Sequence, residues 1–162
     1  MNELDCARLL QSLNKNSVRF ILIGGMNYFL RYRPVTTQDI DIWIEPTVEN
    51  TARCESALNE IDAEWGKGDE DLGPTRLKPV GWLRSQAVYC LLTKCGFVDI
   101  FRSVVGLANF EDSWDRAEIA TMADGIVFHS LCARDMIDCQ LALPETSRKQ
   151  DRINHLKGLL GE

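Results

Sequence analysis

Two closely spaced aspartates are the first residues in this chain whose types and spacing could do chemistry. Asp39 and Asp41 lie in residues 38–44, a segment that alternates polar or aromatic residues with isoleucines. Residues two apart in a β-strand point to the same face, so the two carboxylates project together while Ile40 and Ile42 enter the core. Neighbouring carboxylates repel each other unless a cation lies between them. An acidic, solvent-facing edge strand is the alternative explanation.

Asp99 is a third candidate carboxylate. It lies within the apolar segment 97–101, where a charged group needs a partner. Three carboxylates on one sheet face suit hard, oxygen-seeking cations such as Mg²⁺. Two such ions, about 3.5 to 4 Å apart, stabilise the attacking and leaving oxygens of an in-line phosphoryl or nucleotidyl transfer. The sequence therefore predicts a metal site formed by Asp39, Asp41 and Asp99.

A glycine pair, Gly24-Gly25, follows the apolar segment 19–23 and precedes a helical pattern. A tight turn explains such a pair, because glycine has free access to positive φ. The same turn would expose backbone N–H groups at a helix N-terminus, where a phosphate binds well. Both explanations are open at this point.

Hydrophobic periodicity and turn signals predict the elements that position these residues. Helices are predicted over residues 3–14, 26–32, 132–142 and 146–160, and a further helix follows Pro46 with Thr47 as its N-cap. Strands are predicted over residues 19–23, 38–44, 87–92, 97–101, 117–122 and 126–129, and a loop over residues 66–81. No repeat or linker interrupts this order. We expect a single domain over residues 1–162 of α/β (α+β) class, with a mixed β-sheet flanked by helices and two C-terminal helices.

Composition limits the classes of protein. The 162 residues are 45% hydrophobic and 26% charged, with a net charge of −6, which excludes a disordered chain and argues against general coating of nucleic acid. No apolar run reaches the roughly 20 residues that span a bilayer, and residues 1–5 are acidic where a signal peptide would be basic. The six cysteines form no CxxC pair and indicate reduced thiols. These features favour a cytoplasmic protein that has no membrane partner.

Charge is unevenly distributed along the chain. Residues 6–38 and 72–98 contain basic residues and no acidic ones, whereas residues 39–71 contain eleven acidic residues against two basic ones. A basic groove beside an acidic, metal-binding centre is one interpretation, and a solvated surface is the other. Trp82, close to Arg84 in the second basic segment, is the candidate for stacking on a nucleic-acid base.

Together these residues resemble the DNA polymerase β-type nucleotidyltransferase superfamily. Gly24-Gly25, then thirteen residues, then Asp39-Ile40-Asp41-Ile42 is similar to its Gly-Gly/Ser signature and its strand of alternating aspartates and hydrophobic residues. Residues 33–50 carry most of the resemblance, which spans about residues 18–160. The resemblance is greatest to small bacterial stand-alone members, including nucleotidyltransferase toxins of the abortive-infection type.

The resemblance implies roles for individual residues. Gly24 and Gly25 would contact the triphosphate of a nucleoside triphosphate (NTP). Asp39 and Asp41 would hold two Mg²⁺ ions, with Mn²⁺ as an alternative. Asp99, which falls where the family has a third carboxylate, would complete the site and help to deprotonate the acceptor hydroxyl.

This sequence departs from the family pattern at one position. Gln140 stands where many relatives have a lysine facing the nucleotide phosphates. Either Arg148 or Lys149 would then supply the missing charge, or triphosphate affinity would be weak. The expected nucleotide-binding residues are Gly24, Gly25, Thr37, Gln140, Arg148 and Lys149.

On this basis the sequence predicts an enzyme that moves a nucleoside monophosphate (NMP) from an NTP to a hydroxyl. The alternatives are a nucleotide-binding interaction module that has lost turnover, and a small-molecule, antibiotic-type nucleotidyltransferase. The preferred acceptor is a tRNA 3′ end, because the family's toxin members are associated with tRNA, and such a toxin would have a cognate antitoxin protein as partner. The basic residues that would contact RNA are Arg76, Lys78, Arg84 and Lys94. The acid-rich segment 55–71 would instead suit a cationic antibiotic.

Overall fold

An eight-stranded mixed β-sheet forms the centre of the molecule in the computed structural model, which describes residues 3–162. Met1 and Asn2, part of the acidic N-terminal segment noted above, lie outside the described residues. The spatial order of the strands is β4-β3-β5-β6-β2-β1-β8-β7. The strands are β1 (Phe20–Ile23), β2 (Asp39–Ile44), β3 (Glu64–Trp65), β4 (Gly73–Pro74), β5 (Val88–Thr93), β6 (Gly96–Phe101), β7 (Glu118–Thr121) and β8 (Val127–Ser130). The helices are α1 (Cys6–Lys15), α2 (Gly24–Arg31), α3 (Val48–Glu60), α4 (Phe110–Arg116), α5 (Ala133–Leu141) and α6 (Gln150–Leu159).

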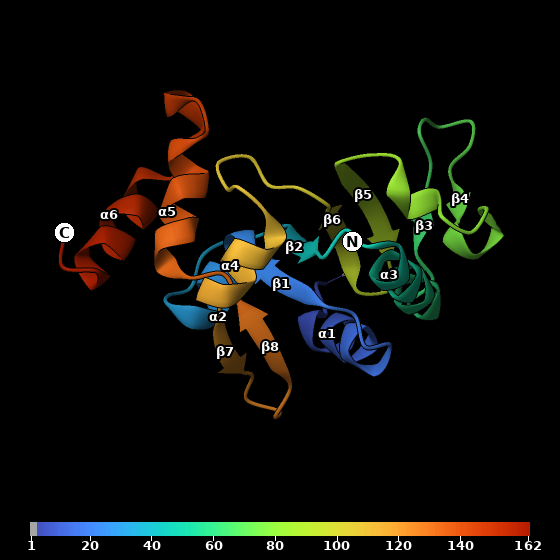
Figure 1. Cartoon of the computed structure of the whole chain (residues 1–162), viewed down its shortest axis with the longest axis horizontal. Coiled ribbons are helices and arrows are strands. Elements are labelled where there is room, and N and C mark those ends of the chain that lie inside the picture. Colours follow the sequence, from blue (N-terminus) through green and yellow to red (C-terminus); the bar gives the residue numbers. More distant parts are fainter. Residues whose placement is uncertain (1–2) are drawn as a thin grey trace.

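Strand pairing places the aspartate-bearing strands side by side. β2 pairs antiparallel with β1 and parallel with β6, and β6 pairs antiparallel with β5 in a hairpin. β1 also pairs parallel with β8, so the sheet is mixed as predicted. Figure 1 shows α5 and α6 together at one end of the molecule, and β3 and β4 at the other. The aspartate-bearing strands lie between these ends.

One face of the sheet is packed against α1 and α3. Ile40, Ile42 and Ile44 alternate with the polar positions of β2 and are completely buried on this face. Burying a side chain of this size contributes about 1.5 to 3 kcal/mol. The Thr47 hydroxyl accepts a hydrogen bond from the Asn50 backbone N–H at 3.2 Å, which confirms Thr47 as the N-cap of α3.

The opposite face is covered over only part of its area. There, Ile21, Ile23 and Trp43 form a second core cluster with residues of α4, α5 and α6. Farther along the same face, toward β5, Leu92 and Phe97 remain 39% and 51% exposed. Asp39, Asp41 and Asp99 lie at the boundary between the covered and the open part of this face.

Most predicted elements are confirmed, with shifted ends. The N-terminal helix begins at Cys6 rather than residue 3, because Asp5 is its N-cap and accepts from the Arg8 backbone N–H at 3.1 Å. α2 begins at Gly24 rather than Met26, because Gly24 has a φ of +71° and lets the chain turn directly from β1 into the helix. The predicted loop contains only the two-residue strand β4 and a short 3₁₀ turn.

α4 was not predicted. It has seven residues, too few to show a helical period in the sequence. Asn109 caps it, and the Phe110 ring packs edge-on against Trp43 at 5.5 Å. All six cysteines are free thiols, in agreement with their spacing. Within residues 3–162, every helix is too short or too polar to span a bilayer.

Candidate active site

The structure brings the three predicted carboxylates together. Asp41 on β2 lies directly opposite Asp99 on β6 in the parallel register, and Asp39 is two residues before Asp41 on the same face. One carboxylate oxygen from each residue lies within 4.8 Å of the other two. This proximity follows from the strand order, since neighbouring strands lie roughly 4.8 Å apart.

The environment of this acidic cluster disfavours its fully charged form. Burial, followed by repulsion from Asp39 and Asp99, raises the pKa of Asp41 to about 8. Burial and the neighbouring Asp39 carboxylate also raise the pKa of Asp99. Among the described residues, Asp41 Oδ1 is buried without a hydrogen-bond partner. A cation would supply that partner and relieve the repulsion.

The donor set therefore fits a hard divalent cation. All three candidate ligands are carboxylate oxygens, which Mg²⁺ and Mn²⁺ prefer over softer metals. Each side chain is only partly buried, so the cluster remains open to a substrate oxygen. The metal-binding roles of Asp39, Asp41 and Asp99 stay predictions.

The glycine turn is in contact with the acidic cluster. A Cβ atom at Gly24 would lie 2.4 Å from Asp41 Oδ2, so a larger residue there would have to displace the Asp41 carboxylate. At Gly25 a Cβ would lie 3.0 Å from Thr37 Oγ1, and that hydroxyl donates to the Asp39 carbonyl at 3.0 Å. α2 begins here without a side-chain cap. Its first N–H groups can therefore bind an anion beside the carboxylates.

A cavity of about 340 Å³ adjoins Asp41. Gly24 and Asp41 line one side, and Gln140 of α5 and Arg152 of α6 line another. Its remaining wall is mostly apolar, and includes Val88, Phe101, Val104, Leu131, Met136 and Leu143. A cavity of this size with apolar walls and few polar groups is typical of a small-molecule site. We call it the apolar cavity.

The predicted nucleotide-binding residues near the C-terminus have different surroundings. Gln140 lines the apolar cavity, and its Oε1 accepts from the Lys149 backbone N–H at 2.7 Å. Arg148 donates to the carbonyls of Leu141 at 2.9 Å and Leu143 at 3.0 Å, so its guanidinium stabilises the end of α5. The Lys149 side chain lines a separate cavity that also contains Arg33.

Arg152 is a site residue that the spacing of residues in the sequence does not indicate. Its Nη2 lies 3.9 Å from the Cβ position of Gly25, and its guanidinium packs over the Tyr28 ring at 4.8 Å. No pattern in the sequence sets it apart from the other charged residues of α6, Asp151 and Lys157. Only the fold shows that this helix returns to the glycine turn.

The proposed base-stacking role of Trp82 is wrong. Trp82 is only 8% exposed, and its ring stacks on Trp65 at 5.4 Å. The backbone N–H groups of Gly81 and Leu83 donate to the Glu55 carboxylate, which holds this turn against α3. The indole is therefore part of the core and cannot contact a nucleic-acid base.

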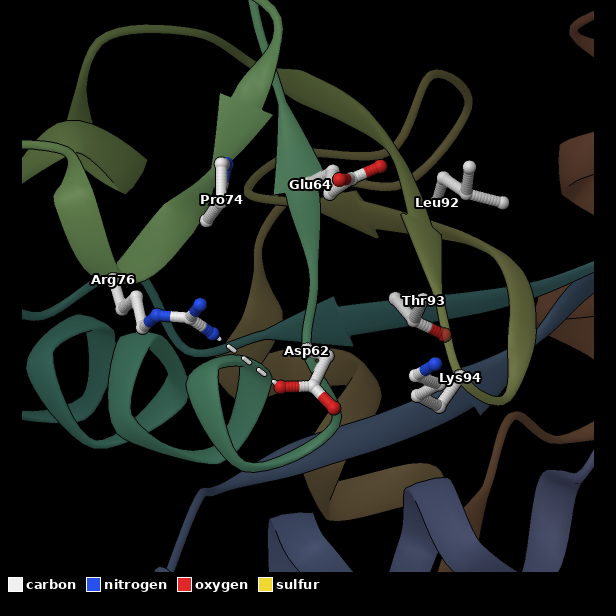
Figure 2. A pocket seen from close by; sticks show the side chains of 7 residues that line it. All are labelled: Asp62, Glu64, Pro74, Arg76, Leu92, Thr93 and Lys94. Atoms are coloured by element: carbon white, nitrogen blue, oxygen red, sulfur yellow. Dashed lines mark hydrogen bonds and ion pairs between the residues drawn. The ribbon is translucent and has the colours of Figure 1, made fainter.

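Two of the four basic residues assigned to RNA contact acidic side chains. Arg76 pairs with Asp62 at 3.4 Å, and Lys78 lies 3.9 Å from Asp71. Figure 2 shows the Arg76–Asp62 pair at the edge of a cavity of about 330 Å³, with Lys94 at another edge. The residues that line this cavity do not include the acidic cluster. This arrangement favours the solvated-surface interpretation of residues 72–98.

Comparison with known proteins identifies the fold. No protein-family model and no curated protein sequence matches the chain. The lincomycin-bound lincosamide antibiotic adenylyltransferase LnuA is similar with a TM-score of 0.63 at 16% identity, over 98% of this chain and 99% of that chain. ANT(2″)-Ia in complex with adenylyl-2″-tobramycin gives 0.59 at 10% identity, over 95% and 86%. A Thermotoga maritima protein, provisionally named a nucleotidyltransferase, gives 0.51 at 15% identity, over 96% and 88%. The chain has the fold of nucleotidyltransferases.

Proposed function

We propose that this protein is a metal-dependent nucleotidyltransferase that moves an NMP from an NTP to a hydroxyl group and releases pyrophosphate. The observation that carries this proposal is the convergence of Asp39, Asp41 and Asp99 beside the uncapped start of α2. This convergence occurs in a fold that the chain shares with enzymes of that class. The predicted resemblance to abortive-infection toxins is a narrower proposal, and nothing in the acidic cluster favours it.

The three aspartates would hold the metal. Two Mg²⁺ or Mn²⁺ ions bound there would neutralise the phosphate oxygens and increase the acidity of the acceptor hydroxyl. The backbone N–H groups at Gly24 and Gly25 would orient the phosphates through hydrogen bonds and the dipole of α2. Most of the rate enhancement would then come from positioning and charge neutralisation.

The apolar cavity is the proposed nucleoside site. It adjoins both Gly24 and Asp41, so a nucleotide whose phosphates lie on the glycine turn can place its sugar and base between the sheet and α5. Val88 and Phe101 of the sheet and Leu143 after α5 offer apolar contacts to the faces of a base. This position leaves the other side of the acidic cluster for the acceptor.

Asp99 is the proposed general base because of where it lies. It is opposite Cys90 in the β5–β6 register, and Phe97, two residues earlier, is half-exposed on the same face. No helix covers this part of the face within residues 3–162. An acceptor hydroxyl can therefore approach Asp99 from the open side and transfer its proton to that carboxylate.

A small hydroxyl-bearing molecule is the better-supported acceptor. The open side combines the acidic cluster with Leu92 and Phe97, which suits a cationic molecule with an apolar part. The solved neighbours with the higher TM-scores are described in complex with lincomycin and with adenylylated tobramycin. The tRNA acceptor, by contrast, loses the support of Trp82.

The direct test is transfer of label. The purified protein is incubated with Mg²⁺, each of four α-³²P-labelled NTPs, and either lincomycin, tobramycin or total tRNA. We expect label on a small molecule and none with Asp41→Asn. Label on tRNA alone would overturn the proposal of a small-molecule acceptor and support the hypothesis of a toxin that acts on tRNA. Nucleotide binding without transfer to any acceptor would support the interaction module, and neither binding nor transfer would refute the proposed function.

A further inference from the structure

The cavity of about 330 Å³ in Figure 2 is lined by residues of β3, β4 and β5 and of the turns beside them. We propose that this cavity, which we call the edge cavity, binds an ammonium group at the far end of the acceptor, and that Glu64 pairs with that group. The acceptor is then a hydroxyl-bearing molecule whose amine is separated from the reacting hydroxyl by an apolar segment. The inference rests on the proposed function for the reacting hydroxyl, whereas the ammonium site stands on strand register, exposure and charge.

Strand register joins the edge cavity to the acidic cluster. Asp39 on β2 is opposite Phe97 on β6, and Phe97 is opposite Leu92 on β5. Leu92 in turn is opposite Glu64 on β3. Directly paired residues point to the same face of a sheet, so these four side chains form one row on the face that carries the acidic cluster. Neighbouring strands lie about 4.8 Å apart, so this acceptor row covers roughly 14 Å from its first residue to its last.

The middle of the acceptor row is apolar and accessible. Phe97 and Leu92 are both among the exposed large hydrophobic side chains of the protein, and they lie on neighbouring strands in direct register. Removing apolar surface from water is favourable, so these two side chains stabilise an apolar segment of a ligand that lies along the row. This part of the row therefore favours an acceptor whose hydroxyl and amine are held apart by an apolar segment.

Glu64 provides a negative charge at the end of the acceptor row. Figure 2 shows its carboxylate on the side of the edge cavity where Leu92 lies, away from the ion pair between Arg76 and Asp62. Within residues 3–162, the Glu64 carboxylate has no ion-pair partner within 4.0 Å. An ammonium group there would donate a charge-assisted hydrogen bond to it.

Lys94 limits the positive charge that the edge cavity accepts. Its side chain lines the same cavity, and among the described residues it has no ion-pair partner either. One ammonium group of a ligand can pair with Glu64, whereas a second in the same cavity would meet the charges of Lys94 and Arg76. The edge cavity therefore suits an acceptor with a single cationic group at its far end.

The test measures binding of 10-aminodecan-1-ol to the full chain by titration calorimetry, in buffer with Mg²⁺, which competes with the ammonium group for the acidic cluster. The comparison ligands are 4-aminobutan-1-ol, which is too short to cover the acceptor row, and decane-1,10-diol, which has no charge. We expect the long amino alcohol to bind more tightly than either of them. Glu64→Gln should weaken its binding about fivefold and leave the diol unchanged.

Three further variants complete the design. Leu92→Ser should weaken the long amino alcohol and the diol alike, because both ligands have the apolar segment. Lys94→Gln should strengthen binding of the amino alcohol about twofold, because it removes a like charge. The matched control is Asp124→Asn, which removes one negative charge from the exposed turn before β8, near the opposite edge of the sheet, and should change nothing. Circular dichroism verifies that each variant is folded.

The outcomes separate this inference from the proposed function. Equal affinity of the parent and Glu64→Gln for 10-aminodecan-1-ol would overturn the ammonium site, even if NMP transfer occurs. Equal affinity of the parent for the long and the short amino alcohol would overturn the acceptor row. If binding depends on Glu64 and Leu92 as expected but no NTP is turned over, the ammonium site stands and the proposed function fails. If Glu64→Gln does not fold, an unchanged affinity in Lys94→Gln refutes the site.

Discussion

Gly24 and Asp41 are in such close contact that the carboxylate oxygen Oδ2 of Asp41 lies 2.4 Å from the position of a Cβ at Gly24. The first residue of α2 is thus pressed against the acidic cluster. This contact couples the conformation of the glycine turn to the position of Asp41. Gly24 cannot be enlarged without displacing Asp41.

Gly24→Ala should therefore impair both stability and metal binding. Alanine at a φ of +71° is strained, and its methyl group would displace the Asp41 carboxylate. We expect a loss of about 1 to 3 kcal/mol in the free energy of unfolding, measured by urea denaturation. The control is Gly158→Ala, an open position in α6, which should be neutral or stabilise by about 0.5 to 1 kcal/mol. Equal effects of the two substitutions would contradict this account.

Metal should stabilise the folded protein through the acidic cluster. Saturating Mg²⁺ or Mn²⁺ should raise Tm, because an ion that binds only the native state shifts the folding equilibrium. Asp41→Asn should abolish the shift. Without metal, the same variant should be more stable than the parent, since the buried Asp41 carboxylate must either stay charged beside Asp39 and Asp99 or take up a proton, and asparagine avoids both costs. Differential scanning fluorimetry measures both effects, and an undiminished metal shift in Asp41→Asn would refute a shared site.

The stability of the metal-free protein should fall as pH rises. The pKa of Asp41 is raised to about 8 in the folded state, from 3.8 for the unperturbed group. The folded state therefore binds a proton that the unfolded state has released, and its contribution to stability is lost progressively between those two values. Urea denaturation in EDTA at pH 5, 6.5 and 8 should show the parent losing stability relative to Asp41→Asn. A parallel pH dependence of the two proteins would show that Asp41 titrates normally.

If the nucleoside binds in the apolar cavity, narrowing that cavity should raise the KM for the NTP. Val105 lines it and is 77% exposed, so a larger side chain there can be accommodated by the folded protein. Val105→Trp should raise the KM for the NTP while leaving the Mg²⁺-induced rise in Tm intact. The matched control is Val80→Trp, at a position that is 89% exposed and outside this cavity. An unchanged KM in Val105→Trp would place the nucleoside elsewhere.

If the acceptor binds on the open part of the sheet face beside Asp99, Phe97 should contact the acceptor and not the NTP. Phe97→Ala removes a half-exposed ring on the same face as Asp99. We expect the KM for the acceptor to rise several-fold, with the KM for the NTP unchanged. Ile119→Ala, on the edge strand β7, removes a side chain that is 70% exposed and should alter neither constant. A rise in the KM for the NTP in Phe97→Ala would contradict the division of the site.

Local pattern predicted part of the acidic cluster. The alternation in β2 determines that Asp39 and Asp41 share a face, and the apolar surroundings of Asp99 indicate a strand. The pairing of β2 with β6 is a long-range feature that the pattern does not specify, and the family resemblance supplied it. The same pattern could not reveal Arg152 as a site residue, because its approach to Gly25 depends on how α6 packs.

The error at Trp82 has a related cause. In the sequence, an aromatic residue among basic ones looks like an exposed stacking surface. The fold buries the indole because Glu55, in the preceding helix α3, accepts hydrogen bonds from the turn around it. A carboxylate that binds backbone N–H groups leaves no periodic signal in the sequence. The basic residues nearby lie at the surface, but without an exposed aromatic ring beside them to stack on a base.

The contact between Gly25 and Arg152 also determines when the site can exist during synthesis. The glycine turn and the acidic strands leave the ribosome before α6, which follows every other described helix and strand in the chain. Closing so long a loop is entropically costly until the intervening sheet has formed. A nascent chain that still lacks α6 would carry its three carboxylates and its glycine turn without the guanidinium of Arg152 beside them.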